Sequence, residues 1–131
     1  MIGPFQTWLG EEHIHLKDFS AAERDFRAAL ISQPNNHFAI YGLGFCLREL
    51  GRHDESEKAL IQAVSGNPDH VPSRLALANL YLKIDRYSDA IREYDTILTK
   101  DPENENIRIN RDSAIEQRIK AEHAGKEDKA L

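Results

Sequence analysis

The sequence predicts an all-α fold made of stacked helical hairpins that repeat along the chain. Pro34, Pro68 and Pro102 stand 34 residues apart, and each one closes a helical pattern of apolar residues. Other landmarks recur with the same period: Leu9-Gly10, Leu43-Gly44 and Leu77-Ala78, then Ala22, Ser56 and Ala90, then Phe26, Leu60 and Tyr94. A period of this length indicates helix pairs that bury their apolar faces only against neighbouring pairs.

These landmarks resemble the tetratricopeptide repeat in spacing and residue type, most closely at Leu9-Gly10, Ala22, Phe26, Ala29 and Pro34. The resemblance covers about residues 3 to 104. It implies a right-handed α-solenoid that binds a protein partner, and it does not indicate which partner. The sequence departs from the pattern where an aromatic residue often opens the first helix, since Gln6, Ile40 and Arg74 stand there.

We expect three repeats, at residues 3–36, 37–70 and 71–104, followed by a capping helix at 105–123. Asn104 can cap that last helix, which lacks the Leu-Gly landmark and is polar on one side. The small and charged residues 124–131 predict a disordered tail.

The first hairpin is expected to begin near Pro4, a residue suited to the first turn of a helix. Ser20 and Glu23 have the spacing of a capping box and predict the start of its second helix. By the same reasoning on residue type, Asp54 and Ser88 are expected to cap the second helices of the other two hairpins.

Gly51 is well placed for a left-handed turn between two helices, because glycine has no Cβ to obstruct that backbone. Lys17 and Asp85 stand at the same place in the other hairpins. Of the two, Asp tolerates a left-handed backbone better than Lys does.

Composition limits the function classes. The net charge of -5 and the pI of about 5.7 argue against nucleic acid, which needs a basic surface. The single cysteine, Cys46, cannot form an intramolecular disulfide. No apolar run approaches the ~20 residues of a membrane helix. We expect a cytoplasmic protein without membrane insertion, although the chain can be a fragment whose targeting segment is missing.

No residue constellation predicts an enzyme, a metal site or a cofactor. The six histidines and one cysteine form no zinc-binding pattern. His13 stands at a core position, which predicts a half-buried structural histidine. Glu11 and Glu12 diverge by ~100° around a helix and are not a catalytic pair.

In a stack of this kind, the first helix of each pair lines the concave face, an orientation that the resemblance implies. The side chains that it places there form the candidate groove for an apolar peptide or helix: Trp8, Glu11, Phe38, Tyr41, Phe45, Arg48, Leu75, Asn79 and Leu82. The aromatic residues among them are not needed for the predicted core. An exposed aromatic patch is typical of an interaction site.

One kind of relative is excluded by residue type. Members that clamp the C-terminal carboxylate of chaperone tails carry basic and amide residues at five positions, which here hold Thr7, Glu11, Gly42, Pro72 and Ala76. Two alternatives to a binding module stay open: self-association into a homo-oligomer, and a non-catalytic domain of a larger assembly.

Overall fold

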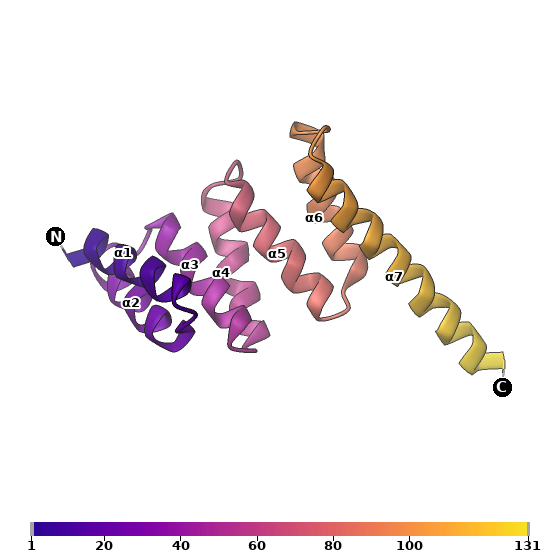
Figure 1. Ribbon diagram of the computed structural model, residues 1–131, viewed down its shortest axis with the longest axis horizontal. Helices are drawn as coiled ribbons and strands as arrows, with labels where there is room; N and C mark the ends of the chain where they lie inside the picture. The colour runs from indigo at the N-terminus through magenta and orange to yellow at the C-terminus, as the bar shows by residue number, and fades with distance from the viewer. Residues whose placement is uncertain (1, 131) are drawn as a thin grey trace. The chain divides into compact units, whose positions relative to one another are not determined.

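The computed structural model describes residues 2–130, and the side chains of residues 5–125. The described residues form seven α-helices joined by short turns, with no strand among them (Figure 1). The helices are α1 (Ile2–His15), α2 (Phe19–Ser32), α3 (His37–Glu49), α4 (His53–Gly66), α5 (Val71–Lys83), α6 (Tyr87–Lys100) and α7 (Glu105–Ala130). The all-α prediction is therefore confirmed.

The chain divides into two compact units, and the division falls inside α5, after Ala76. In the first unit, α1 pairs with α2 and α3 pairs with α4, while α2 also packs against α3 (Figure 1). In the second unit, α6 packs against α7. The turns that separate the helices of each pair lie where the 34-residue period places them.

The core of the first unit is organised around Phe26 of α2, which is 1% exposed. It belongs to a buried cluster that joins α2 to α3 through Ala22, Ala29, Ala39, Leu43, Cys46 and Leu47. A Cβ built on Gly10 would meet the Phe26 ring at 2.6 Å, and one on Gly42 would collide with the same ring. The two glycines therefore allow one aromatic side chain to fill the space between α1 and α3.

A left-handed residue ends the first helix of each hairpin. Lys17, Gly51 and Asp85 have φ values of 59°, 79° and 63°. In each case the next residue donates its backbone N–H to a carbonyl five residues earlier, at 2.9, 2.9 and 2.8 Å. This hydrogen bond is the mark of a Schellman turn. The prediction made from Gly51 holds for all three turns.

The helix caps differ from the predictions made on residue type. Asp18, not Ser20, caps α2, and its Oδ1 accepts a hydrogen bond from the N–H of Ala21 at 3.1 Å. Arg52 and Arg86 precede α4 and α6, and neither side chain makes a capping bond. Asp54 and Ser88 lie inside those helices, so the predictions for both were wrong. Asn104 does cap α7, since it accepts from Ile107 at 3.2 Å.

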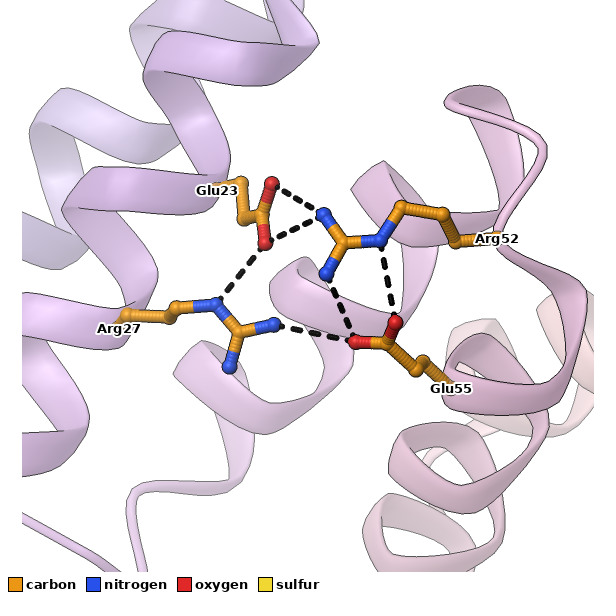
Figure 2. A network of polar contacts seen from close by, with 4 residues as sticks. All are labelled: Glu23, Arg27, Arg52 and Glu55. Atoms are coloured by element: carbon orange, nitrogen blue, oxygen red, sulfur yellow. Dashed lines mark hydrogen bonds and ion pairs between the residues drawn. The ribbon is translucent and has the colours of Figure 1, made fainter.

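Figure 2 shows what Glu23 and Arg52 do instead of capping. Glu23 accepts hydrogen bonds from Arg27 at 2.9 Å and from Arg52 at 2.8 Å, and Glu55 accepts from Arg52 at 2.8 Å and from Arg27 at 3.4 Å. Two cations and two carboxylates thus alternate in a square between α2 and α4. The hydrogen bond to Arg52 lowers the pKa of Glu55.

In the second unit, Tyr94 of α6 is fully buried, and its hydroxyl donates to Oδ1 of Asn79 on α5 at 2.6 Å. The last helix is longer than predicted: α7 continues past residue 123 to Ala130. Lys120–Glu116 and Arg118–Glu122 are spaced to support it at i,i+4, at 3.3 and 4.0 Å. Residue 131 of the expected tail lies outside the described residues.

Candidate functional site: an aromatic strip on α3

Three aromatic side chains follow one side of α3 at the helical spacing i, i+3, i+7: Phe38, Tyr41 and Phe45. The ring centroids of Tyr41 and Phe45 are 6.4 Å apart, within the range of a favourable tilted pair. Phe38 is 60% exposed, whereas Tyr41 and Phe45 are half-buried. We call these three residues together with His70 the aromatic strip.

His70 lies directly before α5 and contacts the two aromatic residues at the exposed end of the strip. Its ring meets Phe38 edge-on at 5.8 Å and Tyr41 edge-on at 5.3 Å. Its Nδ1 lies 2.6 Å from Oγ of the buried Ser73, which fixes the plane of the imidazole. Sequence reasoning missed His70 as a site residue, although the 34-residue period aligns it with the helix caps Asn36 and Asn104.

The other end of the strip is closed by packing. The ring of Phe45 lies 6.3 Å from that of Phe19 on α2, and the guanidinium of Arg48 stands 4.7 Å above it. Arg48 also donates to the carbonyl oxygen of Ala76 at 3.3 Å and to Glu49 at 3.1 Å, and its side chain is only 12% exposed. Phe45 and Arg48 therefore support the strip more than they offer surface to a ligand.

Tyr41 presents a neutral hydroxyl. Burial raises the pKa of Tyr41 above its usual value, and the nearby Arg48 only partly opposes that shift. At neutral pH this phenol can therefore donate one hydrogen bond and accept others.

The other predicted groove residues of the first unit differ in exposure. Leu75 is half-buried and Glu11 is exposed. Trp8 is 54% exposed and stacks on Phe5 at 6.1 Å; no ring contact in residues 5–125 joins it to α3. Asn79 and Leu82 belong to the second unit, and the Asn79 carbonyl oxygen is already used by Tyr94.

The described residues show no group of three or more His, Cys, Asp or Glu side chains that could hold a metal ion. His13 is half-buried as predicted, and its Nδ1 lies 2.5 Å from Oδ2 of Asp25 on α2. Burial, with added repulsion from Glu23, Glu49 and Asp25, raises the pKa of the Cys46 thiol to about 12. A thiol with such a pKa is a poor nucleophile.

A surface pocket of about 490 Å³ lies in the second unit, between the start of α6 and the later part of α7. Its charged and polar lining is largely paired within itself, with Arg86 on Asp89 at 2.9 Å and Tyr87 on Asp85 at 2.9 Å. Within the described part of the chain, no helix is both long enough and apolar enough to cross a membrane.

Models of the tetratricopeptide repeat match this chain at residues 9–72 and again at residues 59–109. Among curated proteins, "Tetratricopeptide repeat protein 21A" of Mus musculus is 28% identical over 109 residues. That match covers 77% of this chain and 8% of the relative. The chain spans between 8% and 20% of the length of the curated relatives that we compared.

Solved structures show the same fold at low sequence identity. The first tetratricopeptide domain of the human RPAP3 protein superposes with a TM-score of 0.86 at 12% identity, covering 93% of this chain and 96% of that one. The TPR2B domain of yeast Sti1, solved in a pHsp70 complex, gives a TM-score of 0.81 at 20% identity, covering 89% of this chain and 98% of that one.

Proposed function

Because this chain belongs to the tetratricopeptide repeat family, whose repeats are protein–protein interaction modules, we propose that it holds an apolar peptide or helix of a partner protein on the aromatic strip of α3. The observation that carries the proposal is the exposed Phe38 ring, held in contact with His70 next to Tyr41. The proposal rests on the first unit alone.

The strip combines an anchor with a polar handle. When an apolar side chain covers an aromatic ring that is mostly exposed to water, the burial stabilises the complex. The Tyr41 hydroxyl can satisfy a backbone group of the bound segment. Since Phe38 and Tyr41 already contact a fixed imidazole, little side-chain entropy is lost when a ligand covers them.

The partner segment is expected to be apolar and not to end in a clamped carboxylate. At the first-unit positions of the clamp, Glu11 is an exposed carboxylate that repels an acidic tail, and Gly42 is closed against Phe26. Thr7 accepts a hydrogen bond from Asn36 at 3.3 Å. These residues supply no cation for an acidic C-terminus.

The test is an unbiased pull-down with the protein as bait, followed by measurement of Kd for the captured partner. Phe38→Ala should weaken binding by at least about 2 kcal/mol, as expected for an interface hot spot, with an unchanged melting temperature. Ile31→Ala is the matched control, because Ile31 is an apolar residue of α2 that is 84% exposed and is not part of the strip. Undiminished binding by Phe38→Ala would show that the strip is not the binding site.

Replacing Tyr41 and Phe45 together would be a poor probe of the strip. Phe45 touches both Phe19 and Arg48, so its removal disturbs the packing of α2 on α3 as well as the strip. His70→Ala is the better second variant, because it removes the ring that contacts both Phe38 and Tyr41 while α3 keeps its own side chains.

A further inference from the structure

The outer side of α1 is an apolar face that the described part of the chain leaves open. Phe5, Trp8 and Glu12 are spaced to lie along one side of α1, and Leu16 follows directly after the end of the helix. Phe5 is 57% exposed, Trp8 54% and Leu16 74%. The Phe5 and Trp8 rings stack with an interplanar angle of 28°. We call this set the outer face.

The same face of α3 is covered, and the structure shows what covers it. Thirty-four residues further along, the outer face becomes Ala39, Gly42, Cys46 and Leu50. Ala39 and Cys46 are fully buried in the cluster with Phe26, and α2 is the helix that supplies that ring. In this protein, such a face is therefore covered by one helix lying alongside it.

The outer face of α1 differs in shape from the equivalent face of α3. On α3, the small residues Ala39, Gly42 and Cys46 surround the large Phe26 ring, whereas α1 carries two large exposed rings of its own. A helix carrying a large ring at the place of Phe26 would collide with Trp8, where α3 has Gly42. The helix that fits must present small residues to Phe5 and Trp8.

Charge restricts the occupant further. Any helix that covers Trp8 and Leu16 also covers the exposed carboxylate of Glu12 between them, with the exposed Glu11 beside it. A carboxylate is costly to bury unless a cation pairs with it. A second copy of α1 would bring a second Glu12 to the same interface, so like charges disfavour it.

We propose that the outer face of α1 is a second docking surface, and that its occupant is an amphipathic helix with a stripe of small apolar residues flanked by Lys or Arg. The helix lies along α1 as α2 lies along α3. This surface is distinct from the aromatic strip, since Trp8 makes no ring contact with α3 in residues 5–125.

Trp8 is the only tryptophan of the chain, so its fluorescence reports directly on the outer face. Two synthetic helical peptides of about 18 residues, long enough to form a helix, serve as probes. Both carry the same Ala stripe; one is flanked by Lys and the other by Glu. The Lys peptide should shift Trp8 emission to the blue and bind at least about tenfold more tightly than the Glu peptide.

Variants separate this surface from the strip. Glu12→Lys, at an exposed position, should reverse the preference between the two peptides. Trp8→Ala, followed by the anisotropy of a labelled Lys peptide, should weaken binding at least about tenfold, and Phe38→Ala should leave it unchanged. Failure of Phe38→Ala to affect a captured partner would count against the proposed function only.

The proposal is overturned if neither peptide moves the Trp8 emission, or if both peptides bind equally well. It is also overturned if light scattering shows a mass that doubles with concentration and returns to that of a monomer in Trp8→Ala. In that case the occupant is a second copy of the chain.

Discussion

The ring of Phe26 on α2 occupies the space that a side chain on Gly42 of α3 would need. A Cβ on Gly10 of α1 would meet the same ring at 2.6 Å. One aromatic side chain thus sets how closely three helices approach, and two glycines make room for it.

We predict that Gly42→Ala lowers the free energy of unfolding by roughly 1–3 kcal/mol, the scale of overpacking in a core. Chemical denaturation monitored by circular dichroism measures it. Gly125→Ala is the control, because a Cβ on Gly125 meets nothing within 4 Å, and it should stabilise α7 by about 1 kcal/mol or less. Phe26→Leu in the Gly42→Ala background should recover part of the loss; equal stability of Gly42→Ala and the wild type would contradict the packing.

At the left-handed turns, introducing glycine and removing it should change stability in opposite directions. Lys17→Gly should raise stability by about 0.5–1 kcal/mol, because Lys17 bears a Cβ at φ 59°. Gly51→Ala should lower stability by roughly 1 kcal/mol, because a residue with a Cβ is strained at the φ of 79° that Gly51 adopts. Thermal melts of both variants decide the matter, and a change of the same sign in both would refute it.

Stability should fall as the solution becomes alkaline, in part through Cys46. Its pKa is about 12 in the folded protein and near 9.0 when unperturbed, so the unfolded chain releases this proton first. The stabilising contribution is complete below pH 9 and is lost as the pH rises towards 12. Denaturant titrations across this range should show a shallower decline for Cys46→Ala than for the wild type. Parallel curves would exclude a role for the thiol.

The square of Glu23, Arg27, Arg52 and Glu55 predicts a response to salt and acid. Glu55 has a lowered pKa, so its contribution is present above the unperturbed value of 4.5 and is lost as the pH falls through the folded value. Glu55→Gln should therefore destabilise the protein at neutral pH and low ionic strength, with a smaller effect in high salt. Glu11→Gln, which changes an exposed carboxylate outside the square, should have no such salt dependence.

Asn79→Ala should cost about 1–3 kcal/mol of stability, because it removes the hydrogen bond that the buried Tyr94 side chain donates to Oδ1 of Asn79. Replacing both partners, with Tyr94→Phe added, should cost less than Asn79→Ala alone. A double-mutant cycle measures this coupling. If the two losses simply add, the hydrogen bond between them has no energetic weight.

The part of the fold that follows the 34-residue period was predictable. The wrong predictions of helix caps came from using residue type in place of that period. Each of the left-handed residues 17, 51 and 85 is followed by the residue that stands directly before α2, α4 or α6. Residue type suggested Ser20, Asp54 and Ser88 instead, since these are good caps. The backbone turn decides the start of the helix, and it places arginine at two of the three positions whether or not the side chain can cap.

The candidate site was only partly predictable. Spacing along one helix was enough to group Phe38, Tyr41 and Phe45 on one side of α3, because such a grouping depends on helical geometry alone. It could not show that Arg48 is nearly covered, since that depends on a carbonyl of α5. His70 was missed for a related reason: its contacts with α3 cross from one hairpin to the next.

The sharing of Phe26 between hairpins separates the unit of sequence from the unit of structure. The ring belongs to the first repeat, yet it packs against Ala39, Gly42 and Cys46 of the second. A chain shortened to begin at α3 would expose these small residues, whereas α1 exposes the large rings of Phe5 and Trp8. Adding or removing one repeat therefore changes the shape of the surface at the end of the stack, and with it the kind of neighbour that the end can accept.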